Sequence, residues 1–116
     1  MASKYELKIV TDFAAAHTLR NYPGACNRMH GHNWKVELEV CSHVLDDVGM
    51  VIDFKAMKKA TKEVCDRLDH YYLNDIEPFN KINPTAENIA AYLYTEIGNL
   101  LNTEHVRVTA LPIWET

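Results

Sequence analysis

Hydrophobic and polar residues alternate along two stretches in the N-terminal part of the chain, residues 4–17 and 32–41. A period of two is typical of a strand with one buried face. Both stretches are therefore predicted to be strands. The apolar positions are Tyr5, Leu7, Ile9 and Phe13 in the first, and Trp34, Val36, Leu38 and Val40 in the second.

Two later segments carry apolar residues at helical spacing. The first follows Asp53, which can cap a helix, and continues to about residue 68. The second begins near Thr85, directly after Pro84. Residues 105–115 alternate again and predict a last strand, in which Pro112 requires a sheet edge or a bulge. The short apolar segment 50–52 allows an additional strand near residues 48–53.

The order strand, strand, helix, helix, strand predicts an α+β fold, with an antiparallel sheet covered by helices on one face. The chain has 116 residues, which suffice for one domain with a hydrophobic core but not for two. We find no internal repeat and no long linker in the sequence. We therefore expect a single domain over residues 1–116.

Composition and charge narrow the possible functions. The chain is 47% hydrophobic and 24% charged, and no apolar run approaches the roughly 20 residues that cross a membrane. The polar N-terminus lacks a signal-peptide pattern, so we expect a cytoplasmic protein without a membrane partner. The net charge of −4 argues against nucleic-acid binding but still allows a small anionic substrate.

Three histidines have positions that suit one metal ion. His30 and His32 are two residues apart, so in extended backbone both imidazoles point to the same side. His17 continues the apolar face of the first strand. Three neutral imidazoles and one open position form the usual catalytic zinc site. The alternative is that all three are ordinary core or strand-end histidines. His43 and His105 are interpreted as solvated.

The three cysteines form no CxxC pair, so neither a disulfide framework nor a zinc knuckle is indicated. Cys41 and Cys65 are assigned to packing. Cys26 precedes His30 by four residues and lies near Arg28, so it can act as a base or nucleophile with a lowered pKa. The alternatives for Cys26 are a small buried side chain or a fourth metal ligand.

Several further polar residues have a structural interpretation, and some of them also have a chemical one. Asp69 and His70 close the first predicted helix. The pair is either a proton-carrying dyad or simply a histidine that is favoured at the end of a helix. Thr85 and Glu87 are accounted for by a helix cap and a first-turn acid. Glu115 is either a solvated terminal acid or the acceptor of two parallel hydrogen bonds from a guanidine-like ring edge.

Five motifs, spread in order over nearly the whole chain, resemble the 6-carboxytetrahydropterin synthase branch of the 6-pyruvoyltetrahydropterin synthase family. The most specific is the C-x3-H-G-H motif of residues 26–32. The others are FAAAH (13–17), LDHYYLN (68–74), NPTAEN (83–88) and WET (114–116).

The resemblance implies a tunnelling fold with a four-stranded antiparallel sheet and two helices on one face. It also implies a homo-oligomer, in which three subunits close a barrel and two trimers stack into a hexamer. Barrel closure would remove the exposed sheet edges that are a liability for a lone subunit. Active sites in this family lie between subunits, so Cys26 and His70 are expected to meet from different chains.

The implied activity is a zinc-dependent lyase that converts 7,8-dihydroneopterin triphosphate to 6-carboxy-5,6,7,8-tetrahydropterin, acetaldehyde and triphosphate, in queuosine or other 7-deazapurine biosynthesis. By resemblance, the metal ligands are His17, His30 and His32. Cys26 is the base, Asp69 and His70 are its acid–base partner, and Glu115 anchors the pterin. Thr85 and Glu87 shape the pterin pocket or its subunit boundary, and Arg20, Arg28 and Lys55 are candidate triphosphate ligands.

Two rival functions are kept. The first is a 6-pyruvoyltetrahydropterin synthase, which eliminates triphosphate without breaking the carbon skeleton. The three-residue spacing between Cys26 and His30 favours the carboxy-forming branch. The second is a non-catalytic zinc or pterin-binding module, against which the proton carriers Cys26, Asp69 and His70 argue.

Overall fold

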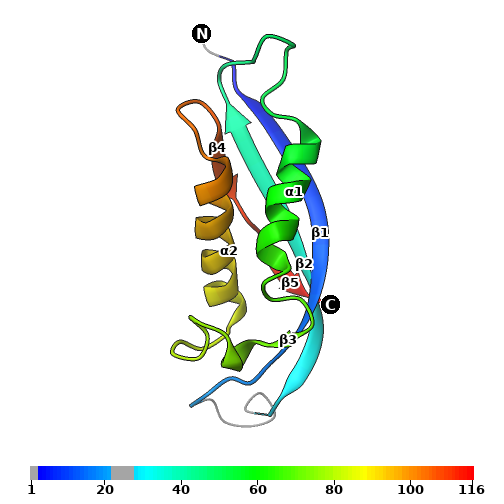
Figure 1. The fold of residues 1–116 in the computed structure, drawn as a ribbon, viewed down its shortest axis with the longest axis vertical. Helices are drawn as coiled ribbons and strands as arrows, with labels where there is room; N and C mark the ends of the chain where they lie inside the picture. Colours follow the sequence, from blue (N-terminus) through cyan, green and yellow to red (C-terminus); the bar gives the residue numbers. More distant parts are fainter. Residues whose placement is uncertain (1–2, 22–27) are drawn as a thin grey trace.

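The two predicted N-terminal strands form one long antiparallel ribbon. The computed structural model describes residues 3–21 and 28–116. Strand β1 (Tyr5–His17) pairs with β2 (His30–Ser42) in unbroken register, from the Tyr5–Ser42 pair to the His17–His30 pair. Both strands agree with the predicted ranges to within two residues. The register brings the C-terminal end of β1 beside the N-terminal end of β2 (Figure 1).

The last predicted strand is divided into two short strands. Strand β4 (Arg107–Ala110) and strand β5 (Ile113–Glu115) both pair with β2, and Leu111 and Pro112 separate them. The Pro112 carbonyl accepts a hydrogen bond from the Glu37 amide at 2.9 Å, while its ring nitrogen has no proton to donate. The expected irregularity at Pro112 is therefore confirmed.

The sheet has one strand more than expected. Strand β3 (Tyr71–Tyr72) pairs in parallel with β1, and the path of the sheet is β3-β1-β2-β4, with β5 also on β2. The expectation of four antiparallel strands was thus wrong in detail, because two residues carry no detectable alternation. The proposed strand near residues 48–53 is also absent, since a turn from Asp46 to Met50 occupies that segment.

Two helices cover one face of the sheet and lie side by side (Figure 1). Helix α1 (Phe54–Cys65) begins where the Asp53 side chain accepts a hydrogen bond from the Lys55 amide. Helix α2 (Ala86–Leu101) begins after Thr85, whose hydroxyl caps the Asn88 amide. Both helix starts agree with prediction. In the described residues, no helix is both long and apolar enough to span a bilayer.

The core lies between the helices and the predicted apolar face of β2. The side chains of Trp34, Val36, Leu38 and Val40 are completely buried there. Met57 and Val64 of α1 and Ile89, Leu93 and Ile97 of α2 pack against them. Each such burial stabilises the fold by about 1.5–3 kcal/mol relative to exposure. Cys41 and Cys65 are buried as well, which confirms their assignment to packing.

Helix α1 ends earlier than predicted, at Cys65 rather than near residue 68. Asp69 and His70 therefore lie in a turn after the helix and do not close it. The backbone of His70 has a φ of 64°, which a continuing right-handed helix cannot accommodate. Its amide donates instead to the Ala14 carbonyl of β1 at 2.6 Å. The correction places the dyad against the sheet, near the end of β1.

Candidate metal centre

Three imidazoles converge where β1 ends and β2 begins. His17 and His30 are paired across the two strands, and His32 lies opposite Ala15. The centroid distances are 4.5 Å for His17–His30, 4.7 Å for His30–His32 and 5.3 Å for His17–His32. One ring nitrogen from each histidine lies within 4.8 Å of the other two. The three side chains can therefore hold a metal ion together.

Backbone carbonyls fix the orientation of two of these rings. His17 Nδ1 donates to the Pro84 carbonyl at 2.7 Å, and His30 Nδ1 donates to the Arg28 carbonyl at 2.8 Å. A carbonyl can only accept, so the proton is on Nδ1 and the Nε2 atom of each neutral ring carries a free lone pair. Such carbonyl contacts typically orient histidines that bind metal through the other nitrogen.

Two ring nitrogens in this cluster are buried without a hydrogen-bond partner: His17 Nε2 and His32 Nε2. Buried polar atoms normally find a partner, so each unsatisfied atom requires an explanation. His17 is only 2% exposed, and this burial lowers the pKa of its imidazole, which favours the neutral form that binds metals. The donor set therefore fits a divalent cation bound by imidazoles.

The indole of Trp34 forms the apolar floor beneath the cluster. Its ring centroid lies 5.2 Å from that of His17 and 5.5 Å from that of His32, both in edge-on contact. Trp34 is completely buried, so it leaves little room for either imidazole to turn away from the other ring nitrogens.

Glu115 extends towards the same nitrogens from β5. Its Oε2 lies 3.2 Å from His32 Nε2, without the alignment of a hydrogen bond, and its Oε1 lies 3.9 Å from His17 Nε2. The side chain is 42% exposed. The sequence singled out Glu115 as an anchor for a ring edge, but the pattern of residues did not place its carboxylate beside the histidines.

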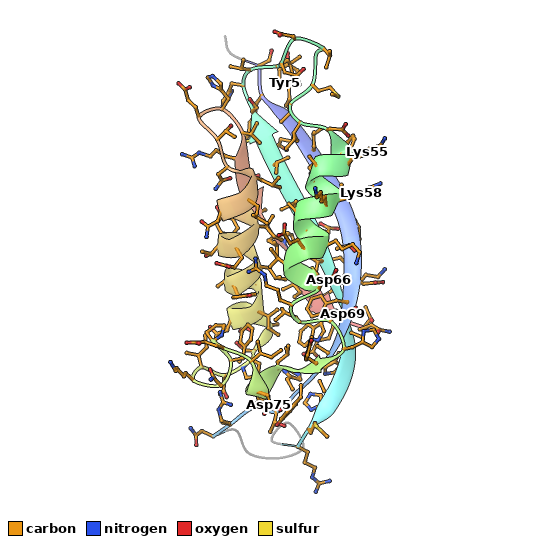
Figure 2. All side chains as sticks on the ribbon, in the orientation of Figure 1. Tyr5, Lys55, Lys58, Asp66, Asp69 and Asp75 are labelled. Atoms are coloured by element: carbon orange, nitrogen blue, oxygen red, sulfur yellow. The ribbon has the colours of Figure 1, made fainter. Side chains whose placement is uncertain are left out.

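Asp69 and His70 contact each other as the dyad interpretation expected. Asp69 Oδ1 lies 3.0 Å from His70 Nδ1 and also accepts the Ala14 amide at 2.9 Å. These contacts, the Ala14 hydrogen bond above all, hold the pKa of Asp69 below its ordinary value of 3.8. His70 is 81% exposed, so its ring is accessible to a bound molecule. Figure 2 shows Asp69 beyond the C-terminal end of α1, next to β1.

An open pocket of about 540 Å³ extends from the His70 ring to one histidine of the cluster. His70 and His32 both line it, together with Tyr71 and Tyr72 of β3. Thr116 closes one side of this pocket. His70 and His32 of one chain thus face the same space.

The remaining predicted site residues have mixed outcomes. Cys26 lies in the segment 22–27, outside the described residues. Thr85 is the N-cap of α2 and Glu87 is exposed in its first turn, so their structural interpretation accounts for what is observed. Their part in a pocket stays a prediction. His43 and His105 are exposed, in agreement with their interpretation as solvated.

Two of the candidate triphosphate ligands, Arg20 and Lys55, lie in surroundings that do not indicate triphosphate binding. The Arg20 guanidinium donates through Nη2 to the Phe79 and Ile82 carbonyls at 2.7 and 2.8 Å. Lys55 is exposed at the N-terminal end of α1, at the opposite end of that helix from Asp69 (Figure 2). Arg20 is therefore a tether for the segment before α2, and Lys55 is remote from the dyad.

The sequence did not reveal the most direct support of the metal centre, the Pro84 carbonyl. Asn83 positions it, since its side chain accepts the Arg20 amide and donates to the Arg20 carbonyl, each at 2.8 Å. A backbone carbonyl has no signature in a sequence, and only the NPTAEN motif marked this segment as special.

The fold and the site together define a class, a helix-covered sheet with three histidines that can hold a metal ion at one end of its longest strands. Comparison with known proteins gives the family. The model of the 6-pyruvoyl tetrahydropterin synthase family matches residues 6–116, and the chain belongs to this family.

Relatives of known name cover most of the chain. A putative 6-carboxy-5,6,7,8-tetrahydropterin synthase of Archaeoglobus fulgidus is 37% identical over 109 residues, which are 93% of this chain and 90% of that protein. The 6-carboxy-5,6,7,8-tetrahydropterin synthase of Bacillus subtilis is 33% identical over 115 residues, covering 95% and 77% of the two chains.

Solved structures share the architecture. The 6-pyruvoyl tetrahydropterin synthase of Caenorhabditis elegans superposes with a TM-score of 0.78 at 25% identity, over 98% of this chain and 96% of that one. The Plasmodium vivax enzyme of the same name gives a TM-score of 0.70 at 20% identity, over 98% and 99% of the chains, and shows the fold alone. The expected α+β tunnelling fold is thereby confirmed.

Proposed function

We propose that this protein is a zinc-dependent 6-carboxytetrahydropterin synthase. The substrate is 7,8-dihydroneopterin triphosphate, and the products are 6-carboxy-5,6,7,8-tetrahydropterin, acetaldehyde and triphosphate. The observation that carries the proposal is the pair of buried Nε2 atoms of His17 and His32, which have no hydrogen-bond partner. His32 also shares a pocket with His70, the exposed member of the Asp69–His70 dyad. The relatives named above support the choice of product.

His17, His30 and His32 hold the zinc ion. When bound, zinc supplies a Lewis acid that orients the substrate side chain and stabilises negative charge on its oxygens. The carbonyls of Pro84 and Arg28 keep two of the rings turned for that role. Trp34 excludes water from the inner side of the cluster.

The chain's own side chains carry the protons. Cys26 is the base that removes a proton from the substrate side chain, and His70 exchanges protons with the opposite side of the substrate. Asp69 orients the His70 ring and stabilises its protonated form through the 3.0 Å contact. Glu115 accepts the 2-amino and N3 hydrogens of the pterin, while Thr85 and Glu87 shape the pocket around the ring.

The biological setting follows from the product. The carboxylated pterin is consumed in the biosynthesis of queuosine and other 7-deazapurines, and we place the protein in the cytoplasm, as one domain over residues 1–116. It works as a trimer or hexamer with no nucleic-acid or membrane partner. The free outer edges of β1 and β4, which pair with no other described strand over most of their length, support assembly through the sheet.

A second function is favoured by the matching family model and by the solved Caenorhabditis elegans structure, which are both named for the pyruvoyl product. A 6-pyruvoyltetrahydropterin synthase eliminates triphosphate from the same substrate and keeps every carbon atom. The two functions differ in one volatile product, acetaldehyde.

The test is to incubate the zinc-loaded protein with 7,8-dihydroneopterin triphosphate and to quantify acetaldehyde and triphosphate together. We expect one acetaldehyde for each triphosphate released. Triphosphate without acetaldehyde would favour the pyruvoyl-forming function. Release of neither product would indicate a non-catalytic binding module. His105→Ala, in an exposed histidine outside the site, is the matched control and should retain full turnover.

A further inference from the structure

The Glu115 carboxylate has one partner in the proposed function and a different neighbour in the structure. In the proposed function, on which this inference rests, it binds the far edge of the pterin ring. In the structure, however, its oxygens lie 3.2 Å from His32 Nε2 and 3.9 Å from His17 Nε2. Without substrate, the carboxylate thus faces the metal centre.

The carboxylate and the ring nitrogens are spaced as ligands of one ion. Two atoms that each lie about 2.0–2.1 Å from a tetrahedral zinc ion are about 3.4 Å apart. The two distances from Glu115 lie on either side of this value. The three imidazole donors all lie within 4.8 Å of one another, which allows a similar arrangement after small ring rotations.

The electrostatics also favour a cation between these groups. His17 donates through Nδ1, so its Nε2 directs a lone pair towards the Glu115 carboxylate. Neither His17 Nε2 nor His32 Nε2 has a hydrogen-bond partner. The lone pair of His17 Nε2 and the Glu115 carboxylate repel each other when nothing lies between them, and a divalent cation would turn that repulsion into ligand bonds.

Only the Glu115 side chain needs to move for the carboxylate to leave. The Glu115 backbone pairs with Trp34 in the sheet, and the next residue, Thr116, donates to the Asn33 carbonyl at 2.9 Å. The side chain itself is 42% exposed, so rotation about its own bonds can carry the carboxylate towards solvent.

We propose that Glu115 is the fourth metal ligand of the substrate-free protein and is released when a pterin binds. The carboxylate fills the open coordination position until the 2-amino and N3 hydrogens of the ring attract it away. Binding of the correct ring then exposes the position that the substrate side chain needs. A molecule without the guanidine-like edge leaves the metal closed.

The test measures metal binding without any turnover. Apo-protein is titrated with Co²⁺ in competition with a chelator, and the visible spectrum of the bound Co²⁺ is recorded. We expect Glu115→Gln to lower the affinity at least about tenfold, as loss of a metal-orienting group does, and to change the spectrum. Glu115→Asp keeps a carboxylate on a shorter side chain, so its Co²⁺ affinity should lie between those of the unaltered protein and Glu115→Gln.

The matched control is Glu104→Gln. Glu104 Oε2 lies 3.9 Å from His105 Nε2, which reproduces one Glu–His distance of the site at an exposed position without further histidines. Its affinity and spectrum should equal those of the unaltered protein. Thermal melts in excess chelator verify that each variant is folded before metal is added.

A second arm adds neopterin, which has the ring edge but no triphosphate. We expect it to change the Co²⁺ spectrum of the unaltered protein and to leave that of Glu115→Gln nearly unchanged. Equal affinity and equal spectra for the unaltered protein and Glu115→Gln would overturn the inference, even if acetaldehyde is formed. Weaker binding in Glu115→Gln without any acetaldehyde would overturn only the proposed function, and no metal binding at all would overturn both.

Discussion

Asp69 receives the Ala14 amide and the His70 ring on one carboxylate oxygen. Because its pKa is lower in the folded chain than in the unfolded one, ionised Asp69 stabilises the fold above its unfolded pKa of about 4. This stabilisation is lost as the pH falls through the folded pKa. We expect Asp69→Asn to lower the free energy of unfolding at pH 7 by about 1 kcal/mol, the low end for a partly exposed charged hydrogen bond.

Urea denaturation across a pH series checks this expectation. The difference between Asp69→Asn and the unaltered protein should shrink below about pH 4, because protonated Asp69 resembles asparagine. Asp12→Asn is the control, since Asp12 is an exposed acid of β1 that only reaches Lys35 at 3.8 Å. It should change stability by less than about 0.5 kcal/mol at neutral pH. A constant Asp69→Asn difference down to pH 2 would contradict the assigned charge effect.

Also at the scale of residues, the alternation of positions along the strands predicted more of the site than the chemical type of single side chains did. His17, His30 and His32 share the apolar faces of two strands, and the hairpin register brings these faces together. Arg20 shows the limit, because a charge in a loop suggested an anion ligand while the fold uses its guanidinium for two carbonyls. Which partner an arginine finds depends on distant backbone, and no local pattern encodes that.

At the scale of elements, two asparagines hold the segment before α2 in place. Asn83 makes two hydrogen bonds with the Arg20 backbone, and Asn88 donates to the Asn83 carbonyl at 2.8 Å. Asn83→Ala leaves these partly buried groups unpaired and loosens the carbonyl that orients His17. We expect a loss of about 1–3 kcal/mol in the free energy of unfolding, measured with urea on the metal-free protein.

The control for this element is Asn99→Ala in α2. Asn99 is exposed and makes only a 3.5 Å contact with Glu96, and alanine is a better helix former. Its stability should be unchanged or slightly higher. If the two alanine variants unfold at the same urea concentration, the Asn83 hydrogen bonds do not stabilise the fold as proposed.

Elements with several repeats of their pattern were predicted well, and very short ones were not. β1, β2 and both helix starts follow from periodicity and caps, because burial of one face determines which residues are apolar. The end of α1 was missed because Leu68 continues the apolar pattern while His70 has a left-handed backbone. β3 has two residues and a parallel partner far along the chain, so its sequence contains no period to detect.

At the scale of the whole molecule, the ribbon of β1 and β2 determines where the chemistry lies. The central part of this ribbon packs into the core under the helices. The lower end of the ribbon in Figure 1 extends beyond the helices and carries the histidines. The long ribbon of β1 and β2 thus has a buried middle and an end that borders an open pocket. The sequence predicted this end as the metal centre through the H-G-H motif, but the pocket depends on β3, β5 and the turn at His70.

The central claim is that three imidazoles from this hairpin hold one catalytic ion. The most direct measurement is the zinc content per chain after loading and exhaustive dialysis, for the unaltered protein and for His30→Ala. We predict one zinc ion per chain in the unaltered protein and close to none in the variant. A zinc-free unaltered protein, or a His30→Ala variant that retains the full zinc content, would contradict the account.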